Sequence, residues 1–218
     1  MGDVVFTDTS KLAFYGRYGS RKTLQIASLI KAFGADRVGV VSAERGLNTV
    51  ASLLKPENVK VATTLDELRS TYAWIKENAN TPEWWWCIDG GSQVMELIAN
   101  EQFAGADGYY DLSSRSQPIP DKLKPFGRDM SDKGAVDAQK IYGRMGRDSE
   151  LLLAAWIRLN TNLYVNYLED MAGNAGREKS LPWGPDVPGK GGLKAVMSSF
   201  DYVGRLSYDS DGRLVGGF

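Results

Sequence analysis

The chain has 218 residues, a length typical of one large α/β domain that can bury a substantial core. Its 26 Lys and Arg residues nearly balance its 27 Asp and Glu residues, which excludes a global positive field, so any contact with nucleic acid must be local. The single cysteine, Cys87, excludes an internal disulfide framework and indicates a reducing environment. The absence of histidine excludes imidazole ligands and Ser-His or Cys-His nucleophiles, so proton transfer would depend on carboxylates.

The N-terminal segment MGDVVFTDTS has neither the basic region nor the apolar region of a secretion signal. No run in the chain approaches the roughly 20 apolar residues that span a bilayer. From these features we expect a soluble, cytoplasmic protein with no membrane partner.

The first part of the chain alternates predicted strands with predicted helices. Short apolar runs predict three strands, at Lys11–Tyr15, Val38–Val41 and Val59–Ala62. Apolar periodicity predicts helices in residues 23–33, in 47–54 and from 65 onward, the last opened by a capping box of Thr64 and Glu67. This alternation predicts an α/β fold with a mainly parallel central sheet and helices on both faces.

A further apolar strand is predicted at Trp84–Ile88, where the sequence reads WWWCI. Its tryptophans could stack on bases, but in a central strand they are better explained as core residues, and Cys87 as a small buried apolar residue. Ser92 can cap a helix that ends near Gln102. The elements predicted after it are a mobile excursion at 104–137, a helix near Ala138–Leu159, a strand at Asn162–Leu168, a Gly/Pro-rich loop at Ala172–Gly192, and a C-terminal hairpin of Phe200–Tyr208 and Arg213–Phe218.

The turn after the first strand has the phosphate-binding pattern G-x-x-x-x-G-K-[ST], except that Arg21 replaces the expected glycine. In this pattern the backbone N–H groups of the turn and the positive end of the following helix face the phosphates. Lys22 is expected to reach the β- and γ-phosphates, and Thr23 to ligate magnesium. An ordinary turn carrying a basic cluster is the alternative. The predicted nucleotide-binding residues are Gly16, Tyr18, Gly19, Ser20, Arg21, Lys22, Thr23 and Leu24.

Two carboxylates complete the predicted site. Asp89 ends an apolar strand, where a P-loop ATPase places a carboxylate toward the magnesium shell. Glu44 follows the strand segment VGVVSA and could polarise the attacking water, a task for a carboxylate in a chain without histidine. The alternative for Glu44 is a solvated residue at the start of a helix.

The segments YGRYGSRKT, VVSAERGL and WWCIDGGS follow one another in an order and spacing that resemble the RecA-like P-loop ATPases. TLDEL at 64–68, IYGRMGRDSELL at 141–152 and PDVPGKGG…FDYVGRL at 185–206 look like short phage-encoded ATPases of this class, which are similar to recombinases and single-strand annealing proteins. The resemblance covers nearly the whole chain and implies a single RecA-like domain over residues 1–218.

By position, the resemblance implies that Lys22 contacts the phosphates, Glu44 is the catalytic base, and Thr23 and Asp89 hold the metal. It implies ATP and Mg²⁺ as cofactors and an ATPase acting in phage DNA recombination or single-strand handling, in the host cytoplasm. Single-stranded DNA is then a further partner, and a homo-oligomer would assemble through the core itself. Arg21 departs from the glycine of the family, which affects the expected hydrolysis rate more than nucleotide binding.

Two other functions remain open at this point. A P-loop kinase for a small molecule would need an arginine-rich lid, for which residues 104–148 supply Arg115, Arg128, Arg144 and Arg147. A scaffold that binds ATP without turning it over is the second alternative, because Arg21 interrupts the phosphate pattern.

Four further polar residues have an open role in the sequence. Lys190 and Lys194, in a Gly-rich segment, could touch DNA or a neighbouring subunit's γ-phosphate, or could simply be solvated. At the end of the strand LYVNYLED, either Asn166 or Glu169 is expected to sense the γ-phosphate.

Overall fold

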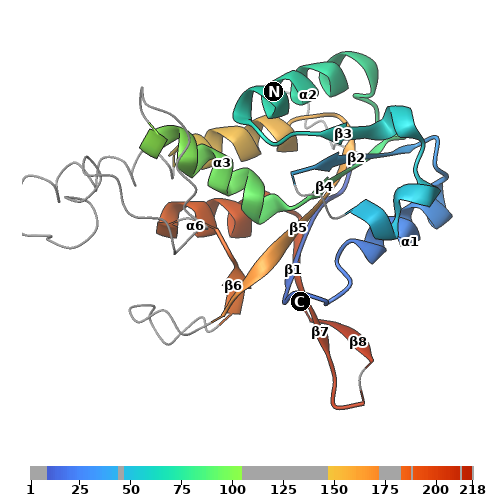
Figure 1. Ribbon diagram of the computed structural model, residues 1–218, viewed down its shortest axis with the longest axis vertical. Helices are drawn as coiled ribbons and strands as arrows, with labels where there is room; N and C mark the ends of the chain where they lie inside the picture. The colour runs from blue at the N-terminus through green and yellow to red at the C-terminus, as the bar shows by residue number, and fades with distance from the viewer. Residues whose placement is uncertain are drawn as a thin grey trace, which may run out of the picture.

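One eight-stranded sheet organises the residues that the computed structural model describes, which are 9–43, 47–104, 147–171, 183–187, 189–211 and 213–217 (Figure 1). The strands are β1 (Lys11–Gly16), β2 (Val38–Ser42), β3 (Val59–Val61), β4 (Trp85–Asp89), β5 (Asn162–Met171), β6 (Trp183–Pro185), β7 (Tyr202–Tyr208) and β8 (Leu214–Gly217). Their order is β3-β2-β4-β5-β1-β7-β8, with β6 paired to β5 off this path.

The strand pairs are mainly parallel. Within the order above only β7 and β8 are antiparallel, and β6 also runs antiparallel to β5. The predicted α/β architecture, with a mainly parallel central sheet and a C-terminal hairpin, is therefore confirmed.

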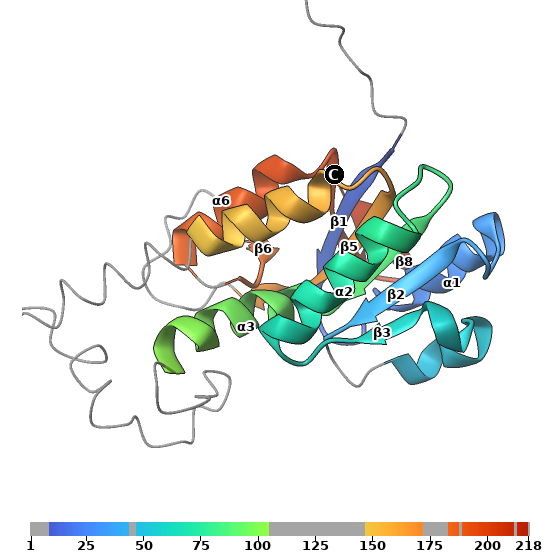
Figure 2. The same ribbon diagram turned by 90° about the horizontal axis from the view of Figure 1, so that it is seen from above.

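Helices cover both faces of this sheet (Figure 2). The helical segments are α1 (Leu24–Phe33), α2 (Leu65–Asn78), α3 (Gly91–Ala104), a helix over 147–157, α6 (Gly189–Ser199), and three 3₁₀ turns, η1 (Leu47–Thr49), η2 (Ala51–Leu53) and η3 (Pro56–Asn58). The capping box predicted for α2 is present: the Thr64 hydroxyl accepts from the Glu67 N–H, and the Glu67 carboxylate accepts from the Thr64 N–H. Within the described residues, no helix is long and apolar enough to cross a membrane.

The apolar sequence of β4 explains why helices pack against both faces of the sheet. Trp86 and Ile88 belong to one buried cluster, with side chains of α2, α3, the 147–157 helix and α6. Trp85 and Cys87 belong to a second cluster, with side chains of α1 and of the segment that holds the 3₁₀ turns. Successive side chains of a strand point to opposite faces, so an unbroken apolar run must be buried on both sides. The prediction that the tryptophans of this run are core residues is confirmed for Trp85 and Trp86, whereas Trp84 is partly buried against the first cluster.

Three predicted local structures differ from the observed ones. Residues 47–54 form two 3₁₀ turns instead of a helix, since Asn, Thr and Val favour helices weakly. The predicted loop 172–192 contains β6 and the start of α6, although its glycines disfavour a helix, because Ala195 and Val196 later in α6 pack into the core. Ser92 lies inside α3, and its hydroxyl accepts a hydrogen bond from the Leu168 N–H instead of capping the helix.

Other predicted segments fall partly beyond the described residues. Apart from Ala104, which ends α3, the excursion 104–137 lies outside them. The helix expected near 138–159 is observed over 147–157, and residues 138–146 are not described. The four arginines of the supposed kinase lid, except Arg147, also lie outside the described part.

Candidate nucleotide site

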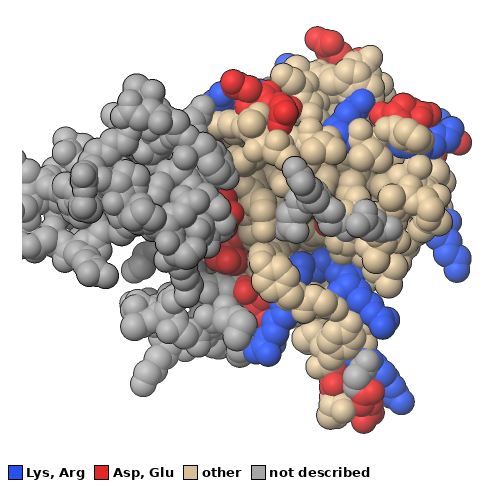
Figure 3. Space-filling model, viewed as in Figure 1, with Lys and Arg blue, Asp and Glu red and all other residues tan. Residues whose placement is uncertain are grey.

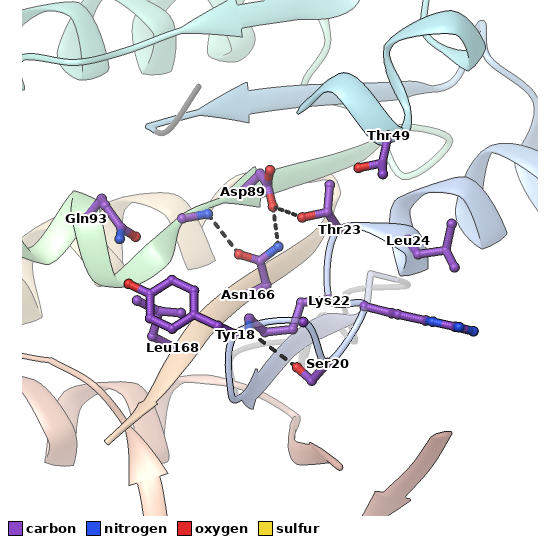
Figure 4. Close-up of a pocket in the computed structure, with 13 residues that line it drawn as sticks. Tyr18, Ser20, Lys22, Thr23, Leu24, Thr49, Asp89, Gln93, Asn166 and Leu168 are labelled. Carbon is purple, nitrogen blue, oxygen red and sulfur yellow. Dashed lines mark hydrogen bonds between the residues drawn. The ribbon is translucent and has the colours of Figure 1, made fainter. Parts of the chain in front are cut away.

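The residues that connect β1 to α1 border a cavity of about 380 Å³ at the carboxyl edge of the sheet (Figure 4). Parallel strands end at the same edge, which is where ligands bind in open α/β sheets. The lining residues are Tyr18, Gly19, Ser20, Arg21, Lys22, Thr23, Leu24, Thr49, Asp89, Gly90, Gln93, Asn166 and Leu168. The loop residues predicted from the phosphate pattern are thus brought together with Asp89. Gly16 is not among the lining residues and contributes its backbone.

Lys22 lies folded inside the curve of the loop. Its Nζ donates to the carbonyl oxygens of Gly16 at 2.7 Å and Arg17 at 2.8 Å, and to the Ser20 hydroxyl at 3.3 Å. Gly16 must be glycine here, because a Cβ would stand 2.5 Å from the Leu206 carbonyl oxygen. The ammonium group is therefore held at the centre of the loop, beside the backbone that would surround a phosphate.

Thr23, Asp89 and Asn166 form a hydrogen-bonded group across three elements (Figure 4). The Thr23 hydroxyl donates to Asp89 Oδ1 at 2.9 Å, and the Asn166 amide Nδ2 donates to the same oxygen. Asn166 Oδ1 in turn accepts from the Gly90 N–H at 2.8 Å. Asp89 and Asn166 are almost fully buried. Because β5 lies between β1 and β4, its residue 166 reaches the carboxylate that ends β4.

These oxygen atoms fit a magnesium ion that binds together with a nucleotide. Among the described residues no group of three or more His, Cys, Asp and Glu side chains could hold a metal by itself. Magnesium, however, usually takes one or two protein oxygens and completes its shell with phosphates and water. The Thr23 hydroxyl and the Asp89 carboxylate, in contact with each other, supply such a pair.

Asn166 and Glu169, both candidates for contact with the γ-phosphate, have different surroundings. Asn166 lines the cavity and contacts Asp89. Glu169 does not line it; its carboxylate forms ion pairs with Arg205, at 2.7 Å, and with Arg17, at 3.7 Å. The geometry therefore favours Asn166 for that contact.

The loop contains an unusual backbone conformation at Arg21. Its φ is 58°, the only positive φ of a non-glycine residue in the described chain, while Gly19 has φ 79°. A left-handed conformation costs an L-residue roughly 1–2 kcal/mol, and glycine avoids this cost. The position where the phosphate pattern expects glycine is thus one whose backbone conformation favours glycine, and Arg21 adopts this conformation under strain.

Four lining residues, Thr49, Gly90, Gln93 and Leu168, were not anticipated from the sequence, nor was Tyr164, which lies near the loop. Gln93 lies in the first turn of α3, and its Oε1 is buried with no hydrogen-bond partner among the described residues. The Tyr164 hydroxyl donates to the Lys22 carbonyl at 2.9 Å, and burial raises the pKa of this phenol well above its usual value, so it remains a donor. Gln93 follows Asp89 by four residues, in the first turn of the helix that starts at the same edge of the sheet, and this was a signal that could have identified it.

Other predicted residues lie apart from the described cavity or outside the described residues. Glu44 is among the residues that the structure does not describe; β2 ends two positions earlier, with Ser42 in register with Asp89. Lys194 is exposed on α6, and the side chain of Lys190 is not described. The roles considered for these three residues remain predictions.

The similarity of this chain to known proteins lies in its structure. No family model and no curated protein matches the chain. Among solved structures, a KaiC-like protein of the hyperthermophilic archaeon Pyrococcus horikoshii OT3 is similar, with a TM-score of 0.41 and 12% identity over 95% of this chain and 76% of that one.

Proposed function

We propose that the protein binds magnesium ATP at the loop of residues 16–23 and hydrolyses it. The observation that carries this proposal is the convergence of the loop lysine, the Thr23 hydroxyl and the Asp89 carboxylate on one cavity. A loop of the pattern G-x-x-x-x-R-K-T alone is weaker support, because Arg21 breaks it. The contact of Thr23 with Asp89 links the loop to a second strand, as a shared metal shell requires.

Each residue has a role that follows from its chemistry. The loop N–H groups and the start of α1 would face the phosphates, and the Lys22 ammonium would turn from the loop carbonyls to the β- and γ-phosphates. Thr23 and Asp89 would hold the magnesium ion, which supplies positive charge next to the phosphate oxygens when bound. Asn166 would orient Asp89 and contact the γ-phosphate.

Glu44 is the proposed general base. In the sequence it follows β2 by two residues, and β2 itself ends beside Asp89, at the edge of the sheet where the cavity opens. A carboxylate in this position would accept a proton from the attacking water. Glu44→Gln should keep ATP affinity and lower turnover at least about 100-fold, since general base catalysis contributes that much or more. Wild-type turnover in this variant would mean that Glu44 is a solvated residue with no role in catalysis.

Calorimetry with Lys22→Ala tests nucleotide binding directly. The loss of charge-assisted contacts should lower ATP affinity by about 10- to 100-fold, the equivalent of roughly 1.5–3 kcal/mol. Lys31→Ala is the matched control, because Lys31 is an exposed lysine in the last turn of α1, away from the cavity. Equal ATP affinity in the Lys22 variant and the wild type would refute the proposed function.

The cellular setting is a proposal that rests on the sequence resemblance. We propose a role in phage DNA recombination or single-strand handling, in the host cytoplasm, with single-stranded DNA as a partner and a homo-oligomer formed through the core. ATP turnover measured with and without a single-stranded oligonucleotide tests this setting. Stimulation by DNA supports it, whereas turnover that a small-molecule acceptor stimulates would indicate a kinase. ATP binding without turnover would indicate a scaffold.

A further inference from the structure

The C-terminal hairpin reaches the phosphate loop through Tyr208. In the parallel pairing of β7 with β1, Leu206 lies opposite Gly16, the last residue of β1. β7 continues for two more residues, so Tyr208 stands beside the loop that follows Gly16. Its hydroxyl donates to the Gly19 carbonyl at 3.0 Å, and its ring centroid lies 6.0 Å from the Arg21 guanidinium carbon.

A second connection joins the same strand to the same loop. Arg205 of β7 donates from Nε to the buried Glu169 carboxylate at 2.7 Å. The other oxygen of this carboxylate lies 3.7 Å from Arg17, the residue that follows β1. Glu169, which does not line the cavity, therefore bridges the hairpin strand and the loop. Basic side chains gather on the surface where the hairpin leaves the body of the molecule (Figure 3).

Tyr208 contacts two loop residues that both have unusual backbone conformations. Gly19 and Arg21 both have positive φ, and only Arg21 has a side chain that disfavours it. A cation above an aromatic ring is attracted to its face, and a hydrogen bond to the Gly19 carbonyl limits rotation of the neighbouring peptide. Both contacts oppose relaxation of the loop toward the ordinary conformation of arginine.

We propose that Tyr208 is a positioning residue for the phosphate loop and that, through it, the C-terminal hairpin sets the affinity of the site for nucleotide. This inference rests on the proposed function. Tyr208 is not among the residues that line the cavity, so it acts through Gly19 and Arg21. Because coupling between two sites is reciprocal, bound nucleotide must also stabilise the contact between hairpin and loop.

Three variants of the full-length chain separate the contributions of the tyrosine. Tyr208→Leu keeps an apolar side chain on the hairpin but removes both contacts, and should weaken binding of a nonhydrolysable ATP analogue about five- to tenfold. Tyr208→Phe removes only the hydroxyl, and should weaken it about two- to threefold. Tyr202→Leu is the matched control, because Tyr202 is an exposed tyrosine at the other end of β7. The affinity of this variant for the analogue should equal that of the wild type.

A double-mutant cycle with Arg21→Gly tests the mechanism. Glycine adopts the left-handed conformation freely and has no cationic side chain, so the ring of Tyr208 no longer makes a cation–π contact at residue 21. In this background Tyr208→Leu should weaken binding only as much as Tyr208→Phe does in the wild type, about two- to threefold. Hydrogen exchange supplies a second readout: the analogue should slow exchange of the amides of residues 205–208 in the wild type, and less in Tyr208→Leu.

Each outcome has a clear consequence. If the wild type binds the analogue and Tyr208→Leu binds it equally well, the inference is wrong while the proposed function stands. A Tyr208→Leu variant that loses thermal stability without a change in affinity has the same meaning, since the residue is then only structural. If Tyr208→Leu lowers the affinity for the analogue by the same factor in the wild-type background and in the Arg21→Gly background, the role assigned to the ring is wrong. If the wild type binds no nucleotide, the proposed function and this inference both fail.

Discussion

The cavity has two walls that are held in different ways. The inner wall, formed by Thr23, Asp89 and Asn166, is joined by direct side-chain hydrogen bonds, and its two residues from β4 and β5 are almost fully buried. The outer wall, formed by Gly19 and Arg21, is exposed and depends on backbone conformations that ordinary residues avoid. The inner wall is positioned by strand order, so each of its residues should matter greatly. The outer wall is positioned by a strained turn and by the hairpin, so changes there should have smaller effects than changes to the inner wall.

Among changes to the two walls, the largest effect is expected from Asp89→Asn in the inner wall. A neutral amide is a poorer partner for the magnesium shell, and its oxygen accepts the hydrogen bonds of Thr23 and Asn166 more weakly than a carboxylate does. ATP affinity in the presence of magnesium should fall about 10- to 100-fold, the equivalent of roughly 1.5–3 kcal/mol for bonds to a charged group. Calorimetry with EDTA should show a much smaller difference. An equal loss with and without magnesium would contradict the metal role.

Asn166→Ala should reduce stability as well as turnover. The substitution leaves the Gly90 N–H without its partner and removes one of the donors to Asp89. Leaving a buried polar group unsatisfied costs about 1–3 kcal/mol, so the free energy of unfolding should fall by that amount in urea titrations. Asn160→Ala is a control on an exposed asparagine just before β5 and should change stability little. If the Asn166→Ala variant has the same free energy of unfolding as the wild type, the hydrogen bonds of Asn166 contribute little to the inner wall.

Gln93→Leu should have opposite effects on stability and on turnover. In the part of the chain that the structure describes, the Gln93 Oε1 is buried without a partner, so an apolar side chain should leave the free energy of unfolding unchanged or raise it by about 1 kcal/mol. If this amide contacts the nucleotide or its water, turnover should fall several-fold. Thermal unfolding and steady-state hydrolysis measure the two effects separately. Unchanged hydrolysis would remove Gln93 from the site.

The smallest effect is expected from Arg21→Gly, which changes the outer wall. Glycine relieves the left-handed strain of roughly 1–2 kcal/mol but loses the contact with Tyr208 and adds chain entropy to the unfolded state. These terms nearly cancel, so stability should change little, while ATP should bind at least as tightly and be hydrolysed faster. Binding and turnover at low and high salt test this, because a charge effect is screened by salt. Lower affinity at low salt, with no gain in turnover, would mean that the cation of Arg21 is part of the phosphate site.

The local signals in the sequence were sufficient for most of the elements and for the residues of the loop. The apolar run WWWCI predicted a strand buried on both faces, and Thr64 with Glu67 predicted the start of α2, because strand burial and helix capping depend on neighbours in the chain. The loop lysine, Thr23 and Asp89 were predicted from their residue types and their places after predicted strands, and the structure brings them together at one cavity. Their roles, like that of Glu44, remain predictions.

Only the tertiary structure decided which residues meet. Sequence left Asn166 and Glu169 equivalent; strand β5 places the first against Asp89 and the second against Arg17 and Arg205. The sequence also predicted a loop where β6 and α6 begin. These elements form because pairing with β5 and packing on the core outweigh weak local propensities. The contact of Tyr208 with the phosphate loop joins residues 189 positions apart, from Gly19 to Tyr208. No local pattern encodes such a contact, since it exists only because β7 pairs with β1 and extends past its end.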